Sequence, residues 1–346
     1  MAKGLFTQGV CVLLRKPVAL TVLQERLSSF QLVGVQESAV DQASPETLVF
    51  DFRPDVGGHL LVTPSSECWP DDMGDPESEP DTFVAWSLGQ FAPLAFPGCL
   101  RRATEQSWEW EQGPEEVASH RAHLRLLISY VLGSEEADEE SDEPSDSEEV
   151  VLIPEDYDAL GEMAFLTKAV SALLDLPEAI CYFNPGGEVL RDQNGLRQGL
   201  NFAWNYEVPP LDMWTNVRLF KGEEPWRLMD TVGMGQLDVP DMEAVYNDRR
   251  YEPADVERFL RDACLYLMQS DEEFGEGDTA DGPGETSWTV MECSESLSDP
   301  PRETLRWLPD DGADPPEAFL RRSSETAEEM DLDQEPDDLD DEAFEV

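Results

Sequence analysis

The chain has 346 residues, of which 76 are Asp or Glu and 23 are Lys or Arg, so its formal net charge at pH 7 is −53. A charge of this sign makes contact with nucleic acid or an anionic membrane surface costly, so we expect neither as a partner. No run of about 20 apolar residues occurs, so we expect no membrane-spanning helix.

The acidic excess is concentrated in four stretches that contain no Lys or Arg: 71–81, 135–149, 270–285 and 323–346. They hold 35 of the 76 acids, which leaves 41 acids against 23 bases in the rest of the chain. Stretches that repel themselves and have little apolar surface to bury do not offset the entropy of the free chain. We therefore predict a disordered acidic insertion over 134–152 and a mostly disordered acidic tail over 299–346.

Residues 1–133 are predicted to form an N-terminal α+β half. The apolar run at 9–16 predicts a buried strand, and apolar residues at helical spacing in 19–30 predict an amphipathic helix. Three short strands are then predicted at 32–38, 47–54 and 59–64.

The second part of this half is less regular. The prolines and acids of 63–113 predict a long irregular excursion with one or two short helices. A short helix is predicted after Pro114, and the apolar segment 124–132 predicts a core strand.

Residues 153–298 are predicted to form a C-terminal α+β half. Helices are predicted at 156–174, 193–202 and 253–268. Strands are predicted at 179–184, 214–222, 226–233 and 242–246, with a terminal strand at 287–294. The fold class is therefore α+β, with mixed, mostly antiparallel sheets, amphipathic helices packed on them, and two halves that we suspect are related.

His120 and His123 are the candidate metal ligands. On a helix, the spacing H-x-x-H places both imidazoles on one face, where they can share a metal with a carboxylate. The H-E-x-x-H motif, which would also provide a general base, is absent. The alternative is that one histidine flanks the strand at 124–132 and the other faces solvent. No motif identifies a catalytic or cofactor-binding residue, so we expect no cofactor.

The cysteines favour a reducing compartment. Six are present, without a C-x-x-C pair, and Cys11, Cys181 and Cys264 lie in apolar runs that predict buried thiols. The N-terminus lacks the pattern of a secretory signal, because its short apolar run is interrupted by polar residues. We therefore expect a cytoplasmic protein.

Several short segments follow one another in a characteristic order. They are AHL at 122–124, FLTKAVSALL at 165–174, AICY at 179–182, GGEV at 186–189, MDTVGM at 229–234, PDME at 240–243 and ACLYL at 263–267. Together they resemble the bacterial domain-of-unknown-function family 4261, from about His123 to Glu292. The resemblance implies an α+β fold and a bacterial cytoplasmic setting, and it implies no activity. The acidic additions at 134–149, at 270–285 and after Asp299 depart from the family pattern.

The sequence favours a non-enzymatic protein over an enzyme. The acid, the three histidines and the lack of a catalytic motif predict a protein-interaction or inhibitor module, immunity-like, that binds a basic protein partner. The alternative is a hydrolase or metal-dependent enzyme that uses His120 and His123 with nearby carboxylates. A third interpretation is that the acid only keeps the protein soluble.

Overall fold

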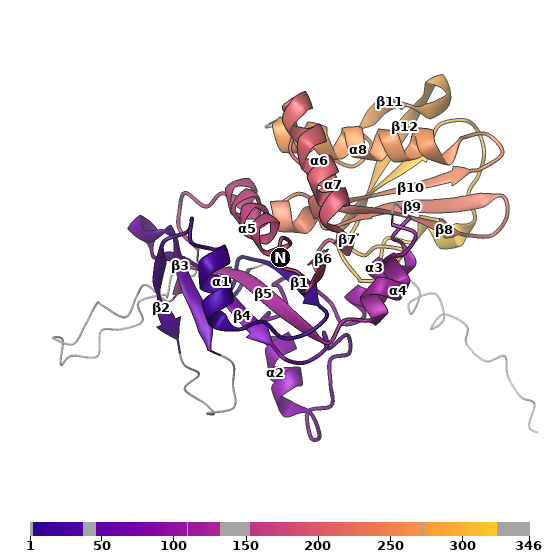
Figure 1. Cartoon of the computed structure of the whole chain (residues 1–346). Helices are drawn as coiled ribbons and strands as arrows, with labels where there is room; N and C mark the ends of the chain where they lie inside the picture. Colours follow the sequence, from indigo (N-terminus) through magenta and orange to yellow (C-terminus); the bar gives the residue numbers. More distant parts are fainter. Residues whose placement is uncertain (1–2, 37–45, 109, 132–152, 271–272, 324–346) are drawn as a thin grey trace, which may run out of the picture. The chain divides into compact units, whose positions relative to one another are not determined.

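The computed structural model describes residues 3–36, 46–108, 110–131, 153–270 and 273–323 (Figure 1). The predicted acidic insertion at 134–152 and the part of the predicted tail after residue 323 lie outside the described residues. The chain forms two compact units, which we describe separately. Unit 1 comprises Met1–Arg218, Thr231–Val239 and Cys264–Gln269, and unit 2 comprises Leu219–Asp230, Pro240–Ala263 and Ser270–Val346.

Unit 1 is built on a seven-stranded antiparallel sheet with the strand order β2-β3-β4-β5-β1-β6-β7. The strands are β1 (Gln8–Leu14), β2 (Leu32–Gln36), β3 (Thr47–Arg53), β4 (Gly58–Ser65), β5 (Ala122–Ser129), β6 (Ala179–Asn184) and β7 (Val189–Arg191). Every residue of β1 is buried. Successive strand residues point to opposite faces, so both faces of the sheet are covered here, which explains the uninterrupted apolar run at 9–16.

The helices of unit 1 are α1 (Leu20–Arg26), α2 (Pro80–Ser87), α3 (Cys99–Glu105), α4 (Gly113–Ala118), α5 (Ala159–Leu173), α6 (Gln193–Tyr206) and α7 (Leu211–Trp214). Two of them begin at an aspartate whose carboxylate accepts a hydrogen bond from a backbone N–H of the first turn. Asp158 caps α5 in this way at 3.0 Å, and Asp192 caps α6 at 2.7 Å. Helix α5 packs against β1 and β5 with its apolar face.

Unit 2 contains most of a six-stranded mixed sheet with the strand order β11-β12-β13-β10-β9-β8. Its elements are β8 (Asn216–Lys221), β9 (Trp226–Val232), β10 (Asp241–Asn247), α8 (Pro253–Gln269), β11 (Thr279–Gly282), β12 (Thr286–Cys293) and β13 (Thr304–Pro309). Strands β10 and β13 pair in parallel. Aromatic rings fill the core: the Phe259 ring on α8 lies 5.2 Å from that of Trp288 and 5.1 Å from that of Trp307.

The predicted α+β class with mostly antiparallel sheets is confirmed. The prediction that 287–294 is the terminal strand is wrong, because one more strand, β13, comes later in the chain. In the sheet, β13 lies between β12 and β10. Strand β13 lies in the range 299–346, which was predicted to be a mostly disordered acidic tail. The predicted division at 134–152 also needs correction, since β6 and β7 belong to 153–298 in sequence but join the first sheet through the pairing of β6 with β1. Whether the halves are related stays a prediction.

The structure also bears on the predicted membrane helices and on the predicted buried cysteines. Within the ranges that the structure describes, no helix is long and apolar enough to cross a membrane. The predicted burial of Cys11, Cys181 and Cys264 is confirmed, since all three are inaccessible to solvent.

Candidate functional site

The two histidines lie where the chain enters β5 rather than on a helix. The Nδ1 atom of His120 is 2.6 Å from the Val117 carbonyl, and its Nε2 accepts a hydrogen bond from the Trp69 backbone N–H at 2.9 Å. The Nδ1 atom of His123 is 3.0 Å from the Glu67 carbonyl, and burial lowers the pKa of His123 to about 3. Across the described ranges, no group of three or more His, Cys, Asp or Glu side chains is placed to hold a metal ion. The metal site stays a prediction, and it would require His120 to give up the backbone hydrogen bond of whichever ring nitrogen bound the metal.

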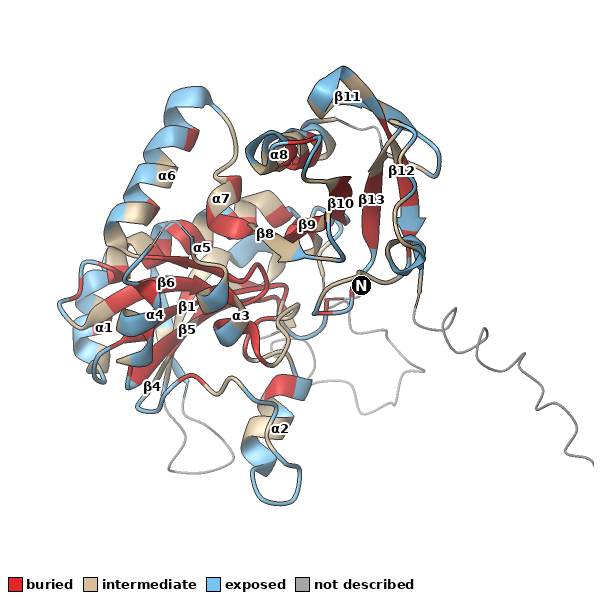
Figure 2. Cartoon of the chain, turned by 90° about the vertical axis from the view of Figure 1, so that its right-hand side faces the viewer, coloured by how far each residue is buried: buried red, intermediate tan, exposed pale blue. Residues whose placement is uncertain are grey.

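An acidic surface segment is formed by residues 71–88 of unit 1, which we call the α2 arm. The segment contains no Lys or Arg. Its exposed acids are Asp72, Asp75, Glu77, Glu79 and Asp81. Three apolar side chains are exposed beside them: Met73, Val84 and Leu88. Figure 2 shows the arm largely in the colour of exposed residues. A surface that mixes carboxylates with apolar groups is complementary to a partner that carries bases and apolar groups.

Contacts at both ends hold the α2 arm to the rest of unit 1. The carboxylate of Asp71 accepts hydrogen bonds from two backbone N–H groups at the start of α3, at 2.7 and 2.9 Å. The indole of Trp86 donates to the Asp72 carbonyl at 3.0 Å. Its ring lies 6.1 Å from that of Trp69 and 4.7 Å from that of Phe91 in the core. The arm therefore presents its acids from a fixed position.

Some exposed bases elsewhere on each unit do little to offset this acid, because they form ion pairs with nearby acids of the same unit. The pairs in unit 1 are Arg15–Glu116, Lys16–Glu178 and Arg197–Asp175. The pairs in unit 2 are Arg250–Asp311, Arg258–Asp255 and Arg322–Glu276. Exposed pairs of this kind contribute little to stability, but they cancel charge locally. The net charge that remains on the surface is negative.

A buried polar cluster surrounds Glu162 on α5. The side chain is fully buried, and its Oε1 accepts a hydrogen bond from the Tyr130 hydroxyl at 2.6 Å. Burial raises the pKa of Glu162 to about 7 despite this hydrogen bond. Burial also lowers the pKa of Lys3, although its ammonium lies 2.9 Å from the Asp238 carboxylate. The Lys3 ammonium also contacts the hydroxyl of Tyr157, which is partly buried.

Unit 2 contains a second cluster, which we call the buried charge network. Arg306 on β13 pairs with Glu243 on β10 at 2.7 Å, and both side chains are fully buried. Arg302 lies 2.6 Å from the carboxylate of Asp230 and 3.2 Å from that of Asp241. Glu243 stands opposite Asp230 in the β9–β10 register and opposite Arg306 in the β10–β13 register. Burial raises the pKa of Glu243, and the Arg306 guanidinium works against that rise.

Sequence reasoning found part of these features. The charge run at 71–81 identified the acids of the arm, but no pattern predicted the Trp86 anchor. The buried charge network does have a sequence signal: Asp230 and Glu243 each lie between apolar residues of a predicted strand. An acid at such a position implies a buried basic partner, and the sequence shows Arg302 and Arg306 downstream. No comparable signal joins Lys3 to Glu162.

Comparison with known proteins gives one family. Residues 230–308 match the family model described as "Domain of unknown function (DUF4261)", and this range contains all five residues of the buried charge network. Neither the curated proteins nor the solved structures contain a match to the chain. The resemblance expected upstream, from His123 to Met229, stays a prediction. Over residues 230–308, therefore, the chain is similar to the DUF4261 family, and the resemblance predicted from the sequence is confirmed there.

Proposed function

We propose that this chain is a non-enzymatic protein-interaction module that binds a basic protein partner. The observation that carries the proposal is the α2 arm, which exposes five carboxylates and three apolar side chains and has no base. In its specific form the proposal is an inhibitor, immunity-like, whose acid covers the basic working face of a nuclease or toxin. The buried thiols of Cys11, Cys99 and Cys181 support a reducing compartment, and we propose the bacterial cytoplasm.

Electrostatics gives this function its expected signature. Opposite potentials on two surfaces steer their encounter and raise the association rate, and the effect weakens as salt screens the charges. The anchored arm adds a fixed pattern of charge, which a disordered acidic segment lacks. Binding to the arm should therefore depend on which acids are present, beyond the net charge of the chain.

The test uses a defined basic probe, a nine-residue peptide of alternating Arg and Leu, with calorimetry on the full chain. The arm variant carries Asp72→Asn, Glu77→Gln and Glu79→Gln, and the control carries Glu105→Gln, Glu111→Gln and Glu115→Gln, which are exposed acids outside the arm. We expect the arm variant to weaken binding about 10-fold, as three exposed charge pairs of about 0.5 kcal/mol each would give.

The control variant removes the same number of charges, so we expect it to change the Kd by less than about threefold. Equal losses in the two variants would show that net charge alone attracts the peptide and that the arm has no special part. If the unaltered chain binds the peptide at neither low nor high salt, the proposed function is wrong.

A further inference from the structure

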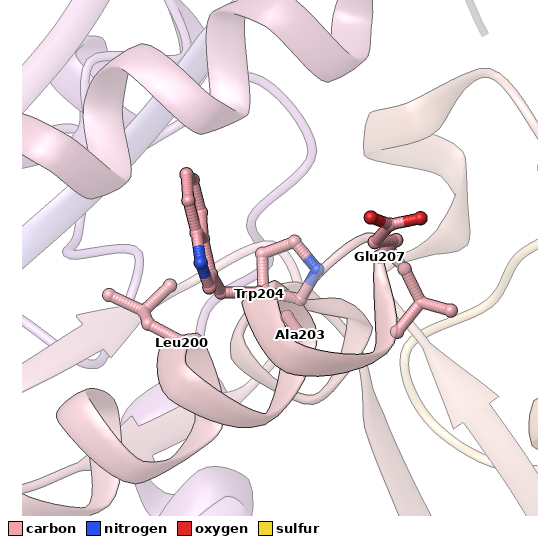
Figure 3. Close-up of a pocket in the computed structure, with 6 residues that line it drawn as sticks. Leu200, Ala203, Trp204 and Glu207 are labelled. Atoms are coloured by element: carbon pink, nitrogen blue, oxygen red, sulfur yellow. The ribbon is translucent and has the colours of Figure 1, made fainter.

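A surface pocket lies at the C-terminal end of α6 in unit 1. Its volume is about 540 Å³, and it is lined by Leu200, Ala203, Trp204, Glu207, Val208 and Pro210 (Figure 3). The Trp204 side chain is 83 % exposed, an unusual state for the largest apolar side chain. Figure 3 shows the Trp204 ring and the Glu207 carboxylate on opposite sides of the pocket.

The end of the helix explains this arrangement. Glu207 has φ 53°, in the left-handed region, and the N–H of Val208 donates to the Ala203 carbonyl at 3.1 Å, which closes the helix. Prolines at 209 and 210 prevent further helix. The end of the helix thus places both Glu207 and Trp204 in the lining of one pocket. Glycine or asparagine usually occupies such a position, and a glutamate here carries a backbone strain that glycine would avoid.

Three features of the pocket favour a cation. The face of an indole attracts an ammonium or guanidinium group more strongly than any other aromatic side chain does. The Glu207 carboxylate has no ion pair with any other residue that the structure describes. The C-terminal end of a helix also carries a partial negative charge. No Lys or Arg lines the pocket.

Helix α6 also carries a second pair of exposed aromatic rings, on a different side of the helix from Trp204. Phe202 and Tyr206 are 55 % and 67 % exposed, and their ring centroids are 4.5 Å apart. Exposed aromatic clusters of this kind are typical of protein interfaces, where Trp and Tyr supply much of the binding energy.

We propose that this pocket receives an Arg or Lys side chain of the partner, held between the Trp204 ring and the Glu207 carboxylate. The proposal rests on the proposed function, because it names an anchoring contact for the same basic protein. The pocket proposal goes beyond the proposed function because it places a binding site on α6, a helix that the charge distribution of the sequence did not mark as a binding site.

The experiment measures binding of the Arg–Leu peptide to four single variants of the full chain. Trp204→Ala and Glu207→Gln alter the pocket. Trp108→Ala removes another tryptophan, 71 % exposed, and Glu105→Gln removes an acid at the end of another helix, α3. A second peptide has citrulline in place of each arginine, because citrulline keeps the shape of arginine and lacks its charge. Circular dichroism of each variant checks that the fold is retained.

We expect Trp204→Ala to raise the Kd about 5- to 30-fold and Glu207→Gln about 2- to 5-fold. The two control variants should change it less than twofold, and the citrulline peptide should show no difference between Trp204→Ala and the unaltered chain. If the unaltered chain binds the peptide and Trp204→Ala binds it equally well, the pocket is not the anchor, while the proposed function stands. If the unaltered chain binds no basic peptide, the proposed function fails, and the pocket proposal fails with it.

Discussion

Replacing Arg306 by Met is expected to lower the free energy of unfolding by about 3 to 5 kcal/mol, because the substitution leaves the Glu243 carboxylate buried without its guanidinium partner. Both side chains are fully buried and lie 2.7 Å apart, so water cannot take over the lost contact. Chemical denaturation of the full chain, followed by circular dichroism, measures the loss.

The double variant Glu243→Met and Arg306→Met provides the control for this prediction. It removes both charges together, so most of the loss should be recovered, as is observed when a buried ion pair is replaced by apolar residues of similar size. A loss below about 1 kcal/mol in Arg306→Met alone would contradict the ion-pair interpretation. The pair lies in the family-matched residues, so the outcome bears on what holds this segment together.

Between pH 5 and pH 8, Glu162 is expected to make the protein less stable as the pH rises. Its pKa is about 7 in the fold against an ordinary 4.5, so folding favours the protonated form. The stabilisation is complete below the ordinary pKa and is lost as the pH rises through 7. A pKa difference of this size corresponds to a change of about 3 kcal/mol in the free energy of unfolding. Tyr130, Tyr157 and Lys3 face the carboxyl; burial raises the pKa of both tyrosines, so neither titrates in this window.

The variant Glu162→Gln isolates this effect from the general repulsion of an acidic chain. It should unfold with the same free energy as the unaltered protein near pH 5 and be more stable by about 2 to 3 kcal/mol at pH 8. Glu105→Gln, at an exposed position, should leave the pH dependence unchanged. A pH dependence that is equally steep in Glu162→Gln and in the unaltered protein would show that Glu162 is not its source.

Local periodicity predicted most elements of the fold. The strand at 9–16 and the helix at 253–268 were clear because their apolar residues follow one another at strand and helix spacing. Strand β13 was missed because Arg306 interrupts its apolar pattern and the surrounding sequence is rich in acid and proline. The pairing of β1 with β6 was missed because contacts between residues far apart in sequence leave no local pattern.

The candidate sites were less predictable than the fold. The acids of the α2 arm were visible as a charge run, whereas its fixed position depends on Trp86, which looks like any other aromatic in the sequence. Helix α6 was expected to end at Phe202, and its extension to Tyr206 places Trp204 and Glu207 at the same helix end, where both line the pocket. A left-handed residue other than glycine has no reliable sequence signature, so this pocket could be found only in three dimensions.

The central claim is that folded surface, rather than the acidic runs at 134–149 and 325–346 of the sequence, binds a basic partner. Nuclear magnetic resonance of the labelled full chain, titrated with the Arg–Leu peptide, tests it residue by residue. The account predicts shifts of backbone signals in 71–88 and 200–210 that saturate together and reverse on addition of salt. Shifts confined to 134–149 and 325–346 would contradict it, because the acidic runs alone would then account for the binding.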